Sequence, residues 1–138
     1  MTILNDQRYR LTQDDTTGTN AHDYSYSYDP NDNRLTSSET GALTFWTYNA
    51  ANRMVTAVSS GQTTTYGYSP NGNLTNVSES SGLTTMAYDK ENRLWVYEGG
   101  GSFTTFLYGG DGLKRLAIEG SGITTLTWDG DDYMGAVS

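Results

Sequence analysis

Residues that could support catalysis are few in this chain. Its only histidine is His22, so a Ser-His-Asp arrangement would have to use that side chain. His22 lies in an Asn-Ala-His-Asp segment that is typical of an exposed loop. The neighbouring acids Asp14 and Asp15, and likewise Asp131 and Asp132, offer the paired carboxylates that glycosidases use, but adjacent acids along a chain are typical of a solvated edge. We therefore predict no catalytic residues and no enzymatic activity.

Two acidic segments match cation-binding loops only in part. Residues 29–33 (Asp-Pro-Asn-Asp-Asn) and 129–132 (Asp-Gly-Asp-Asp) bring several side-chain oxygens together, as hard cations such as Ca²⁺ require. Neither segment has a glutamate at the twelfth loop position, and the same residue types form tight turns. The chain has no cysteine, which excludes thiolate nucleophiles, disulfides and zinc–thiolate sites. We predict turns at both segments, with no metal and no cofactor.

Aromatic side chains could instead stack against sugar rings. The chain has 11 tyrosines, 3 tryptophans and 3 phenylalanines, and most of them follow a regular spacing that is typical of rings packed in a core. Trp95 and Tyr97 lie outside that spacing, and Trp46 is a large ring within it. These three residues are the candidates for sugar binding.

Composition and charge limit the class of protein and its partners. Eight basic and sixteen acidic residues give a formal charge of −8, so nucleic acid would be repelled. No apolar run approaches the roughly 20 residues that span a bilayer. Residues 1–10 have neither the basic start nor the apolar segment of a signal peptide. With only 17% charged residues and 16 glycines in 138 residues, the composition favours one β-rich domain or a run of small repeats.

A 20-residue repeat organises the chain. Six aromatic residues recur at intervals of 20 positions: Tyr28, Tyr48, Tyr68, Tyr88, Tyr108 and Trp128. Another large side chain precedes each of them by two positions: Tyr26, Trp46, Tyr66, Met86, Phe106 and Leu126. Side chains two positions apart lie on the same face of a strand. Each pair therefore predicts a strand.

Turn residues follow each predicted strand. Four positions after each aromatic residue lies a type that tolerates positive φ: Asp32, Asn52, Gly72, Asn92, Gly112 and Asp132. The residues before this position are typical of a type I turn followed by a bulge. An apolar residue then begins a return strand: Leu35, Met54, Leu74, Leu94, Leu116 and Met134. A second turn closes each repeat: Thr40-Gly41, Ser60-Gly61, Ser81-Gly82, Gly100-Gly101 and Ser121-Gly122.

The predicted fold is all-β, an antiparallel meander of about six β-hairpin repeats of 20 residues with about a dozen strands. Residues 24–138 contain six repeats, the last one truncated, and residues 1–23 contain a partial N-terminal repeat and a connecting loop. Strands about 4.8 Å apart would make a sheet roughly 55 Å wide. Such a sheet must curl, fold back or find a partner to cover its aromatic face, so we expect a curled ribbon cut from a longer array.

The repeats resemble a known family. Residues 26–36 (Tyr-Ser-Tyr-Asp-Pro-Asn-Asp-Asn-Arg-Leu-Thr) and 86–94 (Met-Ala-Tyr-Asp-Lys-Glu-Asn-Arg-Leu) closely resemble the tyrosine–aspartate (YD) repeat of RHS proteins, and the resemblance covers about residues 24–138. The motif aspartate is present at Asp29, Asp89 and Asp129. Other residues replace it at Asn49, Ser69 and Gly109. The turn glycine is present at Gly72 and Gly112. The predicted structural residues of the repeat are the three motif aspartates, the two turn glycines and the six recurring aromatic residues: Asp29, Asp89, Asp129, Gly72, Gly112, Tyr28, Tyr48, Tyr68, Tyr88, Tyr108 and Trp128.

The resemblance implies a function. The family includes bacterial polymorphic toxins, C subunits of insecticidal toxin complexes and teneurins, in which a β-sheet ribbon spirals into a hollow shell around a toxin or other passenger. For this chain, the resemblance implies a non-enzymatic shell segment in a secreted or cell-surface bacterial protein. No residues of the family's self-cleaving module can be transferred to this chain. The implied partners are the remainder of a longer shell and its passenger.

Two alternatives come from different classes of protein. The first is a carbohydrate-binding or adhesive surface module, which would use the exposed aromatic rings. The second is a self-assembling β-repeat fragment, which would pair with itself through edge strands or exchanged repeats. Long-range repulsion from the charge of −8 would oppose that association until salt screens it.

Overall fold

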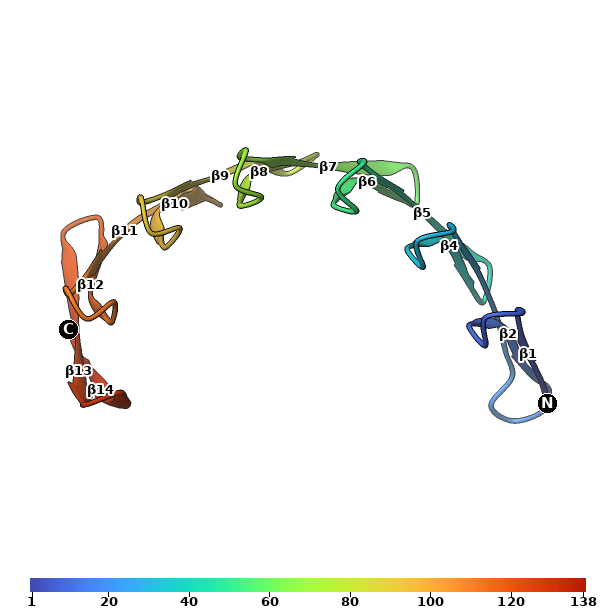
Figure 1. Ribbon diagram of the computed structural model, residues 1–138. Coiled ribbons are helices and arrows are strands. Elements are labelled where there is room, and N and C mark those ends of the chain that lie inside the picture. Colours follow the sequence, from blue (N-terminus) through green and yellow to red (C-terminus); the bar gives the residue numbers. More distant parts are fainter. The chain divides into compact units, whose positions relative to one another are not determined.

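The computed structural model describes all residues, 1–138, and consists of β-strands and turns (Figure 1). The chain forms two compact units, Met1–Tyr66 and Gly67–Ser138. The first unit contains β1 (Thr2–Asn5), β2 (Leu11–Thr16), β3 (His22–Tyr28), β4 (Arg34–Glu39), β5 (Ala42–Tyr48), β6 (Met54–Ser59) and most of β7 (Gln62–Tyr68). The second contains β8 (Leu74–Glu79), β9 (Gly82–Tyr88), β10 (Leu94–Gly99), β11 (Ser102–Tyr108), β12 (Lys114–Glu119), β13 (Gly122–Asp129) and β14 (Asp132–Val137).

Strand order follows the sequence in both units, β1 to β7 and β8 to β14. Each strand pairs antiparallel with its neighbours along the chain, as in β3 with β4 and β11 with β12. The predicted all-β meander of hairpins is therefore confirmed, with fourteen strands in place of about twelve. No helix in the structure has the length and apolarity needed to cross a membrane.

Two kinds of turn alternate along the chain. Five-residue turns precede β2, β4, β6, β8, β10 and β12. A register shift consistent with the predicted bulge lies next to the turn 29–33, where Ser27 pairs with Thr36 and Tyr28 pairs with Arg34. Two-residue loops form most of the other connections between consecutive strands. At Thr40-Gly41 the φ values are 50° and 86°, which is typical of a type I′ turn.

The two-residue loops match the predicted positions in part. The predictions at Ser60-Gly61 and Gly100-Gly101 are confirmed, because all four residues have positive φ. The other two loops lie one residue earlier than predicted, at residues 80–81 and 120–121. The reason is that Gly82 and Gly122 pair with Glu79 and Glu119 and so begin strands.

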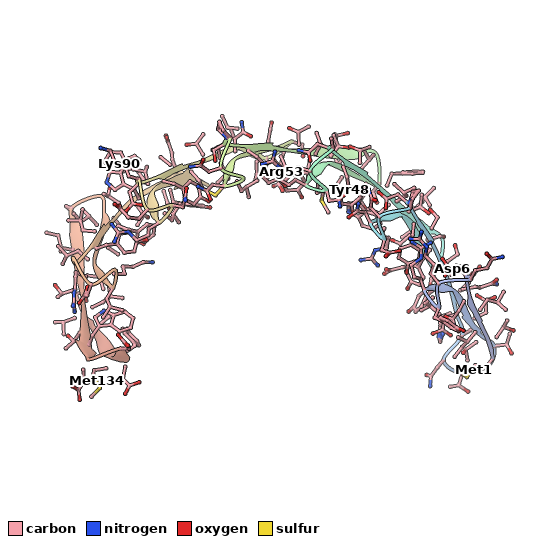
Figure 2. All side chains as sticks on the ribbon, in the orientation of Figure 1. Met1, Asp6, Tyr48, Arg53, Lys90 and Met134 are labelled. Carbon is pink, nitrogen blue, oxygen red and sulfur yellow. The ribbon has the colours of Figure 1, made fainter.

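Neither unit has a buried apolar core. No large hydrophobic side chain is buried, and the two buried polar residues are Ser37 and Thr104. Side chains extend from both sides of the strands (Figure 2). Exposure alternates along β3, β5 and β13, so that one face of each strand is half-buried and the other is exposed. Each unit is therefore a single layer of sheet.

The half-buried face carries the aromatic repeat, and we call it the tyrosine face. It includes Tyr26 and Tyr28 of β3, and Phe106 and Tyr108 of β11. The side chains of the residues that alternate with these along each strand point to the opposite side of the sheet, which we call the open face. Six large apolar residues on the open face are at least 40% exposed: Leu43, Phe45, Leu83, Phe103, Leu107 and Ile123. The most exposed apolar side chains of these strands therefore lie on the face opposite the aromatic repeat.

Candidate functional site

The five-residue turns share one hydrogen-bond pattern. In the turn 29–33, the Asp29 amide donates to the Asn33 carbonyl (2.9 Å) and the Asp32 amide donates to the Asp29 carbonyl (3.2 Å). The Asp29 carboxylate accepts from the amides of Asn31 (2.8 Å) and Asn33 (2.9 Å). One side chain thus satisfies two amides that the strands cannot pair. We call this arrangement the aspartate turn.

Different side chains supply the same acceptor in other repeats. Asn49 accepts from the amides of Ala51 (2.9 Å) and Arg53 (3.1 Å). Asp89 accepts from the amides of Glu91 (3.0 Å) and Arg93 (2.9 Å). Ser69 Oγ accepts from the Asn73 amide at 3.2 Å. A replacement of the motif aspartate therefore keeps the turn wherever a short side-chain oxygen remains.

The sequence did not predict the acceptor in the turn 109–113 or the turn 6–10. In the turn 109–113, where the motif residue is Gly109, Asp111 instead accepts from the Leu113 amide at 3.1 Å. In the turn 6–10, Asp6 accepts from the amides of Arg8 (2.8 Å) and Arg10 (3.1 Å). Asp6 lies 23 residues before Asp29, so it falls outside the 20-residue spacing. An acid followed four positions later by arginine, as in Asp89 and Arg93, is the signal that could have revealed it.

The left-handed position of the turn is confirmed at five of the six predicted residues. Positive φ occurs at Asp32, Asn52, Gly72, Asn92 and Gly112. Tyr9 takes the same position in the turn 6–10, with φ 62°. The prediction is wrong at Asp132, which begins β14 and pairs with Asp129. That hairpin has a two-residue loop with its positive φ at Gly130 (58°), as in a type II′ turn. Asp129 therefore ends a strand instead of starting an aspartate turn.

Ionic contacts reinforce several of these turns. Arg93 Nε lies 2.6 Å from Asp89 Oδ2, and Arg10 Nε donates to Asp6 Oδ2 at the same distance. Burial alone would raise the pKa of Asp89, but hydrogen bonds from the backbone and side chain of Arg93 outweigh it and lower the pKa. Hydrogen bonds from the Asn33 side chain, and then from backbone amides, lower the pKa of Asp29. The turns therefore favour ionised carboxylates.

Side chains also join consecutive aspartate turns. Arg10 Nη1 donates to Asp32 Oδ1 at 2.6 Å, which joins the turns 6–10 and 29–33. Asn31 and Asn33 both donate to Asn52 Oδ1 at 3.1 Å, which joins the turns 29–33 and 49–53. In the second unit, Asn71 (3.0 Å) and Asn73 (2.9 Å) donate to Asn92 Oδ1, which joins the turns 69–73 and 89–93. The residue in the left-handed position is the acceptor each time.

The aromatic repeat forms hydrogen bonds to the preceding hairpin. The hydroxyl groups of Tyr28, Tyr48 and Tyr108 donate to the carbonyls of Leu11 (2.9 Å), Arg34 (3.0 Å) and Leu94 (2.7 Å). Trp128 Nε1 donates in the same way to the Lys114 carbonyl at 2.7 Å. Tyr68 and Tyr88 end β7 and β9 at the equivalent sequence position. The aromatic residues therefore link one hairpin to the next in addition to covering the sheet.

Cationic side chains cover part of the tyrosine face. The guanidinium groups of Arg10 and Arg93 lie 4.8 Å and 4.7 Å from the ring centres of Tyr28 and Tyr108. Lys114 Nζ lies 4.1 Å from the Phe106 ring. Such contacts shield the rings from water, and the electron-rich face of each ring attracts the cationic group above it.

The three candidate sugar-binding residues lie in different settings. The Arg34 guanidinium is 4.9 Å from the Trp46 ring, so one side of that ring is already covered. Tyr97 is half-buried in β10, opposite Met86 and Thr104. Trp95 is 49% exposed and lies at the bulge of β10, since Leu94 and Val96 pair with β9 on either side of it. The structure does not gather the three into one site.

His22 is in a strand and not in the exposed loop that the sequence favours. It begins β3 opposite Thr16, and its side chain is 26% exposed. Its Nε2 lies 3.2 Å from Asp14 Oδ1, and its Nδ1 lies 3.2 Å from the Asn20 carbonyl oxygen. A Ser-His-Asp arrangement would pair one ring nitrogen with a nucleophilic hydroxyl, whereas here the two nitrogens face acceptor oxygens, the Asp14 carboxylate and the Asn20 carbonyl.

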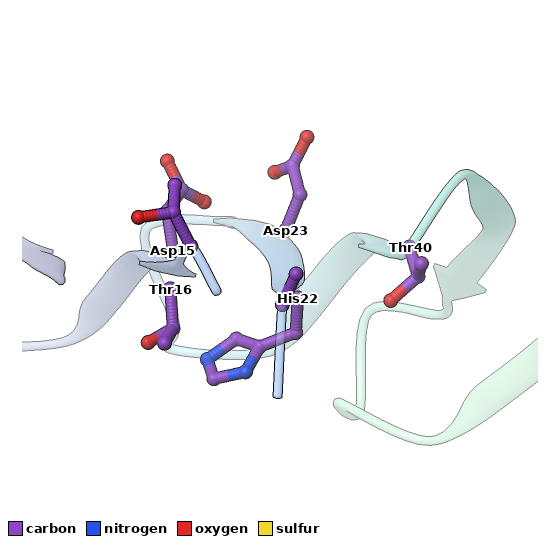
Figure 3. Close-up of a pocket in the computed structure, with 7 residues that line it drawn as sticks. Asp15, Thr16, His22, Asp23 and Thr40 are labelled. Carbon is purple, nitrogen blue, oxygen red and sulfur yellow. The ribbon is translucent and has the colours of Figure 1, made fainter. Parts of the chain in front are cut away.

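A shallow pocket of about 380 Å³ lies beside this histidine (Figure 3). Its lining includes Asp15, Thr16, His22, Asp23 and Thr40. Figure 3 shows Asp15 and Asp23 pointing to one side of the strands, whereas His22 points to the other. The acids and the imidazole therefore do not converge on a common point.

Comparisons with known proteins agree with this geometry. The family model described as the teneurin YD-shell matches residues 44–115, which is just over half of the chain. No curated protein sequence matches the chain. The crystal structures of TcdB2-TccC3-Cdc42 and of TcdB2-TccC3 each match with a TM-score of 0.70 and 13% identity, over 86% of this chain. This chain spans 7% of the length of either matched chain, and the likeness to them is one of fold. The chain belongs to the YD-shell family of RHS/YD-repeat proteins.

Proposed function

We propose that this chain is part of the wall of a YD-repeat shell that encloses or scaffolds a passenger, such as a toxin, in a secreted or cell-surface protein. The observation that carries the proposal is the single-layer sheet without a buried apolar core. A globular domain that acted alone would bury its large apolar residues. Here hydrogen-bonded turns and aromatic residues hold a single layer of sheet together in each unit, as a wall requires.

The open face supports this role. Exposed apolar surface costs roughly 25 cal/mol per Å² in water, and the open face of the second unit carries Leu83, Phe103, Leu107 and Ile123. These side chains are 40% to 56% exposed. Contact with a passenger would remove that surface from water, so a wall segment gains stability when the shell is filled.

The experiment uses the complete product of the gene that encodes this chain. Limited proteolysis should find a segment outside residues 1–138 that resists cleavage while the repeats are folded. Replacement of Asp89 by alanine, which removes an aspartate turn, should expose that segment to the protease, whereas Asp89→Asn should not. Absence of any protected segment would contradict the proposal. A product that is limited to these repeats and associates with itself would favour the self-assembling alternative.

One observation favours the carbohydrate-binding alternative. Trp95 presents about half of its surface to solvent, and a flat exposed indole is suited to stacking on a sugar ring. A glycan array with the unmodified chain and the Trp95→Ala variant would test this alternative. Saturable binding that Trp95→Ala abolishes and Trp46→Ala retains would support it. Equal binding by all three proteins would contradict it.

A further inference from the structure

One aspartate turn differs from the others in its chemistry. The turn 69–73 contains Asn71 followed by Gly72, which is the only Asn-Gly pair in the chain. Asn71 is exposed, and its side chain donates to Asn92 Oδ1 at 3.0 Å. A side-chain amide followed by glycine can react with the next backbone nitrogen, because glycine has no Cβ to block the approach.

We propose that Asn71 is a site of spontaneous deamidation. The Gly72 nitrogen attacks Asn71 Cγ, so that a new C–N bond closes a succinimide ring. The bond from Cγ to the side-chain nitrogen breaks, and ammonia leaves with the proton lost from Gly72. Water then opens the ring at one of its two carbonyls, which gives aspartate or isoaspartate. The reaction needs no reagent other than water.

The folded turn controls the rate of this reaction. The Gly72 amide donates to the Ser69 carbonyl at 2.9 Å, and the Ser69 amide donates to the Asn73 carbonyl at 2.8 Å. The attacking nitrogen is therefore held in a hydrogen bond that must break before the ring can close. Reaction occurs when the turn opens locally, so the extent of deamidation records how often this hairpin opens.

The product weakens the connection between two turns. Asn92 Oδ1 accepts from both Asn71 and Asn73 in the native structure. A carboxylate at position 71 has no proton to donate and places a negative charge beside that oxygen. Isoaspartate would also lengthen the backbone inside a turn that two hydrogen bonds close. The modified hairpin therefore opens more readily than the native one.

The chain contains a matched control. Asn31 occupies the same position of the turn 29–33 and donates to Asn52 Oδ1 at 3.1 Å. Its neighbour is Asp32, which has φ 68° where Gly72 has φ 89°. The two sites share the backbone hydrogen bonds of the turn and the side-chain donation to the next turn. They differ in the residue that follows the asparagine and in the residue that begins the turn, because the Asp29 carboxylate accepts from the Asn31 and Asn33 amides whereas Ser69 Oγ accepts from the Asn73 amide.

The test is peptide mapping by mass spectrometry after incubation of the whole chain at mildly alkaline pH. We expect at least about tenfold more aspartate and isoaspartate at position 71 than at position 31, because only Gly72 leaves the backbone nitrogen unobstructed. An unstructured peptide of residues 66–76 should react faster than the folded chain, and Gly72→Asp should reduce reaction at Asn71 to the level of Asn31. Equal modification at positions 31 and 71, or none at 71 while the peptide is converted, would overturn the proposal.

A second variant separates the reaction from its effect on the turn. Asn71→Asp reproduces one product without incubation. Its Gly72 amide should exchange with solvent several-fold faster than in the unmodified chain, while the Asp32 amide keeps its rate. Unchanged exchange at Gly72 would contradict the proposed weakening of the turn.

Discussion

The two kinds of turn in this chain are stabilised in different ways. An aspartate turn relies on a side-chain oxygen, as at Asp29, Asn49 or Asp89, which accepts backbone amides inside the loop. A two-residue loop such as Thr40-Gly41 relies on positive φ at both residues. The aspartate turn consequently accepts several residue types in its left-handed position, from glycine to tyrosine, because its shape is fixed elsewhere.

The largest expected effect comes from removing the side-chain acceptor. Asp89→Ala leaves the amides of Glu91 and Arg93 without their acceptor and removes the ion pair between Arg93 and Asp89, while Arg93 keeps its contact with the Glu91 carboxylate at 3.2 Å. Hydrogen exchange of those two amides should accelerate by roughly one to two orders of magnitude. Asp89→Asn is the control, because Asn49 shows that an amide oxygen can accept both bonds. Equal acceleration in both variants would show that charge matters more than the acceptor.

A smaller effect should come from the left-handed position itself. Gly112 has φ 85° and Gly110 does not have positive φ, and an added Cβ would meet no atom within 4 Å at either residue. Gly112→Ala should destabilise the chain by about 1–2 kcal/mol. Gly110→Ala should stabilise it by about 0.4–1 kcal/mol, because it restricts the unfolded chain. Urea unfolding measures both, and a shift in the same direction for the two variants would be inconsistent with the assigned turn.

Loss of one hydroxyl in the aromatic repeat should have a moderate effect. Tyr108→Phe removes the hydrogen bond to the Leu94 carbonyl and should cost about 0.5–1.5 kcal/mol. Tyr9 is 90% exposed and serves as the control, since Tyr9→Phe should leave unfolding unchanged. If both substitutions had the same small effect on unfolding, the hydrogen bond from the Tyr108 hydroxyl would not contribute to the connection between hairpins.

Acid should distinguish the two kinds of turn. The pKa values of Asp29 and Asp89 are lowered in the folded chain, so their contribution to stability is present above the ordinary carboxyl value of 3.8. That contribution is lost as the pH falls below 3.8 toward the lower folded value. Amides of the turns 29–33 and 89–93, whose acceptors are Asp29 and Asp89, should then lose protection before those of the Thr40-Gly41 loop. Simultaneous loss would indicate global unfolding without a specific contribution from the turns.

The sequence predicted the features that depend on one repeat at a time. The spacing of Tyr28 and its equivalents predicted the strands, and the residue types at Asp32 and Gly72 predicted the left-handed positions. These features are local because strand alternation and φ preference act within a few residues.

Features that depend on contacts between repeats were not predicted. The donation from Asn33 to Asn52, and from the Tyr108 hydroxyl to Leu94, requires knowledge of which groups are neighbours in the folded sheet. The hairpin at Asp129 was also misjudged. Its spacing fits the repeat, but Gly130 allows a two-residue loop that keeps Asp129 and Asp132 paired.

Residue-resolved hydrogen exchange of the unmodified chain measures whether the five-residue turns hold the hairpins together. The amides of Asn49, Asp89 and Gly109 donate across the five-residue turns to Arg53, Arg93 and Leu113, at 2.9 to 3.0 Å. We predict that these turn amides are protected nearly as well as the amides of the strands, and that protection recurs every 20 residues along the chain. Turn amides that exchange as freely as those of an unstructured peptide, while the strands remain protected, would contradict this prediction.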